Sequence, residues 1–187
     1  MEEKTKPQAR TRDLGKGSIP KLLAQLAIPV VVAQIVNLLY NIVDRIYIGH
    51  IPGEGSLALT GVGVCMPIIM IVTAFAALIS SGGAPRASIC MGKQDNKSAE
   101  QILGNCFSLQ IVVSIVLTVV LLIWNKDLLM AFGASKNTLG YATDYMRIYA
   151  LGTLFVQLTL GMNAFITAQG FTTTSMVSVL IGAICNI

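Results

Sequence analysis

The chain has 187 residues, of which 54% are hydrophobic and 12% are charged, whereas roughly 25% of the residues of an ordinary soluble domain are charged. Its mean hydropathy is +0.71, and a chain of this length cannot bury several apolar runs of about 20 residues in one soluble core. The composition excludes a soluble domain and predicts an integral membrane protein. The net charge of +4 arises from basic residues at one end and in loops, so it does not indicate nucleic-acid binding.

Residues 1–18 form a polar tail that is rich in lysine and arginine. The positive-inside rule predicts that this tail is cytoplasmic. The first apolar segment, 19–48, is long enough to cross a bilayer as a helix. Pro29 lies inside it and predicts a kink, because proline removes one backbone hydrogen bond. The turn after it, residues 50–56, contains no lysine or arginine, which is typical of an external loop.

A polar stripe runs along this first segment. Gln34, Asn37, Asn41 and Asp44 follow one another at spacings of three, four and three, which places them on one face of a helix. A carboxylate near mid-membrane costs roughly 2.5–3.5 kcal/mol, so we expect the stripe to face other helices or a water-filled cavity. Tyr40 is a further candidate for lining that cavity, whereas Gln34 is better explained as a structural residue.

Further apolar segments follow at about 57–79, 102–124, 141–168 and 176–187. Arg86, Lys93 and Lys97 after the second segment predict that the next loop is cytoplasmic again. The last segment has 12 residues, fewer than the roughly 20 that a span needs, so we expect a longer protein of which this chain is one part. The predicted fold is all-α: a polytopic membrane helix bundle with four transmembrane helices and the start of a fifth.

Short motifs occur in order along nearly the whole chain. They are Leu26-Ala-Ile-Pro29, Asn41-Ile-Val-Asp44 with Tyr47-Ile-Gly49, Gly61-Val-Gly63 with Met66-Pro67, Ser88 to Gly92, Phe132-Gly-Ala-Ser135, and Asn163-Ala-Phe165 with Ala168-Gln-Gly170. Each motif alone is weak, but six in register are specific. With them the chain resembles the multidrug and toxic compound extrusion (MATE) transporters. One position departs, since Thr167 stands where many relatives carry a basic residue.

The resemblance implies twelve transmembrane helices in two six-helix lobes, an architecture of parallel repeats that recurs among transporters. This chain would supply residues 19–187 as part of the N-terminal lobe, and its partners would be the lipid bilayer and the missing C-terminal lobe. The implied function is an antiporter in the cytoplasmic membrane that exports organic cations or drugs against a sodium or proton gradient. The family's fifth helix often reads Asn-x-x-x-Asp, and Asn186 falls on that asparagine.

Asp44 is the principal candidate for coupling. A desolvated carboxylate can bind a proton or share a cation, and we hypothesise that protonation biases the bend at Pro29. Asn41 and Asn37 could offer amide oxygens to a cation. The resemblance adds Asn186 and implies a Na⁺ site between Asp44 and Asn186. The alternatives stay open: the asparagines could serve as interhelical contacts worth about 0.6 kcal/mol each, and Asp44 could be solvated near the outer interface.

Other function classes fit the sequence less well. A flippase for lipid-linked precursors would need several cationic residues inside the membrane, and Arg45 is the one candidate within a span. An enzyme would need a nucleophile–base pair or an HExxH-like metal motif, and neither occurs. The four cysteines show no CxxC pairing and there is one histidine, so we expect no cofactor and no metal beyond the coupling ion. A last alternative is a chain without transport of its own, because part of one lobe cannot enclose a two-lobed cavity.

Overall fold

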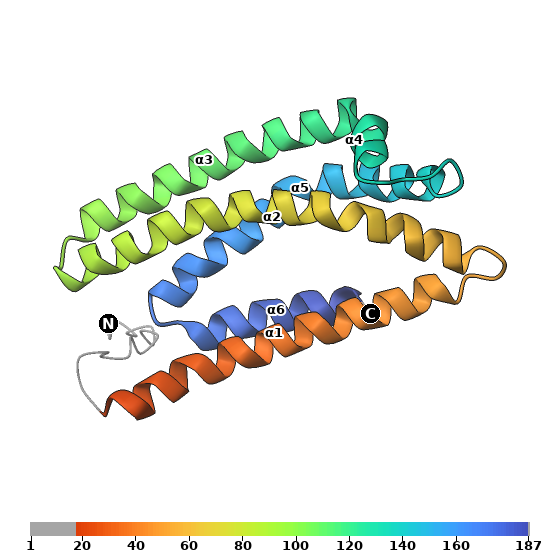
Figure 1. Cartoon of the computed structure of the whole chain (residues 1–187). Coiled ribbons are helices and arrows are strands. Elements are labelled where there is room, and N and C mark those ends of the chain that lie inside the picture. Colours follow the sequence, from red (N-terminus) through yellow and green to blue (C-terminus); the bar gives the residue numbers. More distant parts are fainter. Residues whose placement is uncertain (1–17, 187) are drawn as a thin grey trace, which may run out of the picture.

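The computed structural model describes residues 18–186, and within that range the side chains of Lys21, Cys185 and Asn186 lie outside the description. The predicted cytoplasmic tail therefore falls almost entirely outside the described residues. All elements in the described part are helices: α1 Ile19–Gly49, α2 Gly55–Gly92, α3 Asn96–Ile123, α4 Asn125–Ala131, α5 Leu139–Ala168 and α6 Thr172–Asn186 (Figure 1). Four of these, α1, α2, α3 and α5, are long and apolar enough to cross a membrane, which confirms the predicted all-α bundle.

The helix ends differ from the predicted segments. Helix α2 continues past residue 79 through Gly82-Gly83 and Pro85 to Gly92. Helix α3 begins at Asn96, because the Asp95 side chain caps its first turn by accepting a hydrogen bond from the Ser98 amide at 3.1 Å. The connection expected between the third and fourth spans contains the short helix α4. Helix α1 is continuous through Pro29.

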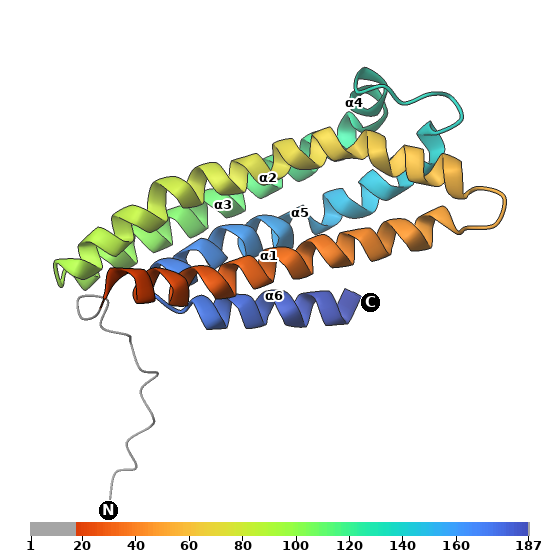
Figure 2. The same ribbon diagram turned by 60° about the horizontal axis from the view of Figure 1, so that its bottom comes forward.

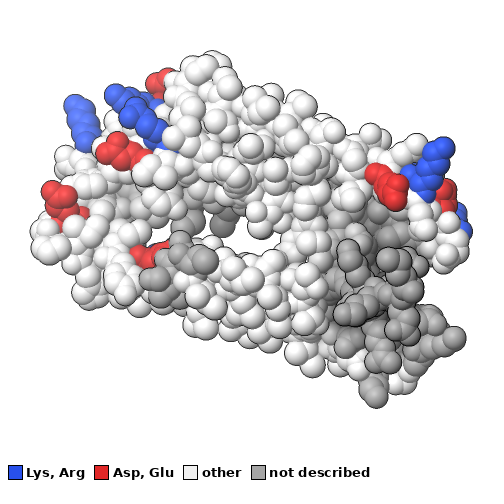
Figure 3. Space-filling view, turned by 180° about the vertical axis from the view of Figure 1, so that it is seen from behind, with Lys and Arg blue, Asp and Glu red and all other residues white. Residues whose placement is uncertain are grey.

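The helices form two groups. Helix α2 packs against α5 and α3, while α1 packs chiefly against α6. Both ribbon views show α1 and α6 side by side, with α2, α3 and α5 together (Figures 1 and 2). In the space-filling view charged side chains gather at the two ends of the molecule, with a broad uncharged surface between them and a hollow between the two groups (Figure 3). An uncharged surface between two charged ends is the pattern expected of a protein surface that contacts lipid.

A buried polar layer ties α3 and α5 to the middle of α2. The side chains of Gln110 on α3 and Gln157 on α5 are fully buried. The Gln157 Nε2 donates to the Val72 carbonyl at 2.7 Å, and the Gln110 Nε2 donates to the Ala76 carbonyl at 3.3 Å. Polar side chains that hydrogen bond between helices are expected inside a membrane bundle, since lipid offers them no partner.

Helices α2 and α5 approach each other closely at Gly61. A Cβ atom at this position would lie 3.1 Å from the Ala142 amide nitrogen and 3.1 Å from the Tyr141 Cβ. Gly63, two residues further, faces outward, and a Cβ there would meet nothing within 4 Å. The two glycines therefore lie on the same helix but in different surroundings, so substitutions at these positions can be compared directly.

We predict that Gly63→Ala stabilises the protein and Gly61→Ala does not. Alanine in place of glycine favours a helix by up to about 1 kcal/mol, but overpacking at Gly61 should cost about 1–3 kcal/mol. Thermal unfolding of the two variants in detergent measures the difference. Equal melting temperatures would show that α2 and α5 do not meet closely at Gly61.

A second prediction concerns pH. The hydrogen bonds with Ser98 hold the pKa of the Asp95 carboxyl below its ordinary value of 3.8, and nearby Lys93 lowers it further. Because the folded pKa is lowered, the cap stabilises α3 above about pH 4 and is lost as the pH falls through the folded pKa. Hydrogen-exchange protection of the Ser98 amide should therefore fall on acidification. Asp95→Asn, which keeps an acceptor but does not titrate, should remove this pH dependence; the same dependence in both proteins would contradict the assignment.

Candidate cation and substrate site

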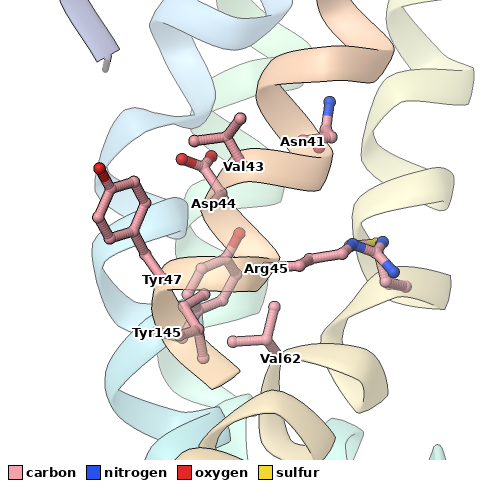
Figure 4. A pocket seen from close by; sticks show the side chains of 9 residues that line it. Asn41, Val43, Asp44, Arg45, Tyr47, Val62 and Tyr145 are labelled. Atoms are coloured by element: carbon pink, nitrogen blue, oxygen red, sulfur yellow. The ribbon is translucent and has the colours of Figure 1, made fainter. Parts of the chain in front are cut away.

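A cavity of about 380 Å³ lies where α1, α2 and α5 meet, near the end of the molecule that carries the α1–α2 turn. Its walls combine two oppositely charged side chains with an amide, two tyrosines and apolar groups (Figure 4). The lining residues are Asn41, Val43, Asp44, Arg45, Tyr47 and Ile48 from α1, Val62 and Met66 from α2, and Tyr145 from α5.

Both charged side chains come from α1, whose last turns form one wall of the cavity. Asn41, Asp44 and Ile48 follow at spacings of three and four and share a face. Asp44 and Arg45 are consecutive, so their side chains leave the helix about 100° apart. In Figure 4 Arg45 extends toward α2 while Asp44 leaves on another side, toward α5. The Arg45 Nη2 lies 3.6 Å from the Met66 Sδ, to which it donates.

Helix α5 contributes a partly buried tyrosine that sequence reasoning missed. Tyr145 lies close enough to Asp44, Arg45 and Tyr40 to interact electrostatically with all three. One turn further along α5, the Tyr149 hydroxyl is buried and has no hydrogen-bond partner within the described part of the chain. A signal for both was present, because polar side chains recur every four residues along α5. They are Tyr145, Tyr149, Thr153 and Gln157, with the last two fully buried.

The predicted stripe reaches the cavity only with its last members. Asn41 and Asp44 line it, and Asp44 is partly buried. Asn37 lies one turn further from the cavity, and its backbone carbonyl accepts a hydrogen bond from the Asn41 Nδ2 at 2.7 Å. Gln34 is exposed and is not a lining residue. Tyr40 is partly buried and interacts with Tyr145, but it too is not a lining residue.

Of the other two predicted residues, Pro29 is not among those that line the cavity. Pro29 precedes Asp44 by 15 residues, which is about 22 Å along a helix, so its coupling to Asp44 stays a hypothesis. The Asn186 side chain lies outside the described residues, and its proposed contact with a cation at Asp44 stays a prediction. Within the described part of the chain no group of three or more His, Cys, Asp or Glu side chains is arranged to hold a metal ion.

Comparison with known proteins gives consistent results. The family model MatE matches residues 29–187. The multidrug export protein MepA of Staphylococcus haemolyticus is 25% identical over 172 residues, which cover 92% of this chain and 38% of that protein. MepA of Staphylococcus aureus strain NCTC 8325 is 21% identical over 172 residues, which cover 92% of this chain and 38% of that protein. The chain thus spans about two fifths of the length of the curated relatives that it matches.

Solved structures agree on the fold. The MATE multidrug transporter DinF-BH, solved as a complex, superposes with a TM-score of 0.85 at 33% identity, over 95% of this chain and 39% of that one. A MATE transporter crystallised in a bent conformation superposes with a TM-score of 0.83 at 23% identity, over 94% of this chain and 39% of that one. All of these proteins are transporters or carry export names, and none is named as an enzyme.

Proposed function

Since the chain belongs to the MatE family, whose members matched here are membrane transporters, we propose that it forms part of the N-terminal lobe of an antiporter that exports organic cations or drugs in exchange for Na⁺ or H⁺. The whole protein would contain a second lobe that closes the cavity from the other side. The observation that carries the proposal is the partly buried Asp44 carboxylate in the wall of a cavity between three membrane helices.

Asp44 is suited to bind either a coupling ion or a cationic substrate. A carboxylate that is partly withdrawn from water attracts a proton or a cation more strongly than one in bulk solvent. The Asn41 amide and the Tyr145 hydroxyl supply neutral oxygen atoms around the same cavity, and oxygen is the ligand atom that hard cations prefer. Tyr47 and Tyr145 add aromatic rings, which attract organic cations.

Exchange follows if the coupling ion and the substrate compete for Asp44. A proton or Na⁺ on the carboxylate cancels the charge that holds the substrate cation, so binding of one favours release of the other. With the N-terminus in the cytoplasm, as the basic tail and the loop with Lys93 and Lys97 favour, the cavity would lie toward the outer face. Entry of the ion from outside would then release the substrate to the outside.

We predict that Asp44→Asn abolishes coupled export. The variant has nearly the same shape, so expression and folding should persist while the exchangeable charge is lost, and dye export should fall at least tenfold. Transport into inverted vesicles that contain the protein expressed from its complete gene measures this. Asp144→Asn is the matched control, since Asp144 is an exposed carboxylate on α5 outside the cavity lining. Unchanged export by Asp44→Asn would overturn the proposal.

The same vesicles distinguish the coupling ion. A sodium gradient and a pH gradient are imposed separately, and export that responds to only one of them identifies the ion. We expect Asp44→Asn to remove the response in either case. Export that persists with neither gradient would mean that the protein is not an ion-coupled antiporter.

A further inference from the structure

The cavity carries a positive side chain that the proposed exchange does not use. Resting on the proposed function, we propose that Arg45 recognises a negative group on the transported compound. The cavity then selects amphoteric compounds, which carry an ammonium and a carboxylate or similar acidic group, over simple organic cations. Asp44 and Arg45 would each hold one of the two charges.

The geometry of Arg45 supports a role toward a ligand. Its guanidinium crosses from α1 toward α2 along the cavity wall (Figure 4). The hydrogen bond recorded for it goes to the Met66 Sδ at 3.6 Å, and a thioether is a weak acceptor. A guanidinium has five N–H donors in a planar fork that matches a carboxylate or phosphate with two parallel bonds. The contact with Met66 therefore orients Arg45 while engaging one of its nitrogen atoms, Nη2.

The charges of the cavity favour an amphoteric ligand. Among the described lining residues one carboxylate and one guanidinium balance each other. A simple cation at Asp44 experiences electrostatic repulsion from Arg45. A compound with both charges avoids that repulsion and leaves the occupied cavity neutral.

The size and the walls suit such a compound. Ligand cavities in proteins commonly measure about 300–1,000 Å³, and this one measures about 380 Å³. Tyr47 and Tyr145 could flank an aromatic body, with Val62 and Ile48 adding apolar surface. The two charged side chains leave α1 about 100° apart, so they would hold groups at two different edges of that body.

The competing explanation is that Arg45 reaches a lipid phosphate, as arginines near helix ends often do. The observed side chain instead crosses toward Met66 on the neighbouring helix. A lipid role also makes a different prediction, because it would affect all substrates alike and would depend on anionic lipid.

The test uses two rhodamine dyes that differ in one group. The ethyl ester of the dye carries a single positive charge, and its free acid carries a carboxylate in addition. Fluorescence polarisation measures the binding of each dye to the complete protein, purified into nanodiscs of phosphatidylcholine alone or with phosphatidylglycerol. The variants are Arg45→Gln, Arg45→Lys, which keeps the charge, and Arg147→Gln, which removes an exposed arginine of α5 outside the cavity lining.

We expect Arg45→Gln to weaken binding of the free acid at least tenfold and to strengthen binding of the ester, in both kinds of nanodisc. Arg45→Lys should retain much of the preference for the free acid, and Arg147→Gln should leave both affinities as they are. Equal changes for the two dyes, no change for either, or an effect that requires phosphatidylglycerol would overturn the assignment of Arg45 while leaving the proposed function intact. Binding of neither dye by the unsubstituted protein would overturn both.

Discussion

Hydrocarbon offers no hydrogen-bond partners, and this constraint limits where the polar groups of the four spans can lie. It is met in two ways. Near the middle of α2 the Gln110 and Gln157 side chains point into the bundle and donate to carbonyl groups of that helix. Nearer the end of the molecule, Asn41 and Asp44 line a cavity instead. The first solution fixes helices to one another, whereas the second keeps polar atoms accessible to a ligand.

These two solutions fall on different groups of helices. The α2–α3–α5 group is held by the polar layer and by close approach at Gly61. The α1–α6 pair packs mainly within itself and is joined to the rest near the α1–α2 turn and the α5–α6 turn. The cavity lies on the seam between the groups, with Asp44 on the less tightly packed side. Under the proposed exchange, an ion at Asp44 would act on the contact between these two groups of helices.

The sequence predicts the spans and part of the site, for different reasons. Length and hydropathy suffice for α1, α2, α3 and α5, because a bilayer sets the length of a spanning helix. Helix ends are less predictable, since the start of α3 depends on the local hydrogen bond between the Ser98 amide and the Asp95 side chain. Helical spacing places Asp44 and Asn41 on one face of α1, and both line the cavity. The stripe on α1 could not identify Tyr145, because a stripe on one helix does not reveal which residues of another helix oppose it. The signal for Tyr145 was the four-residue spacing of polar side chains along α5.

Helical spacing places Gln34 on the same face as Asp44, although Gln34 does not line the cavity. Residues on one helical face point in the same direction but need not have the same surroundings. Over the ten residues from Gln34 to Asp44 a helix advances by about 15 Å, so residues on one face can lie against different neighbouring elements. The reverse also holds: Arg45 lies off the stripe and would be dismissed by spacing, yet it lines the same cavity. Because Arg45 lines the same cavity, it affects what happens when an ion binds Asp44 under the proposed exchange. Neutralising Asp44 would leave Arg45 as the one charged side chain among the described residues that line the cavity. That charge would repel the ammonium group of a bound compound, so the two neighbouring residues together would make release of the substrate follow from arrival of the ion.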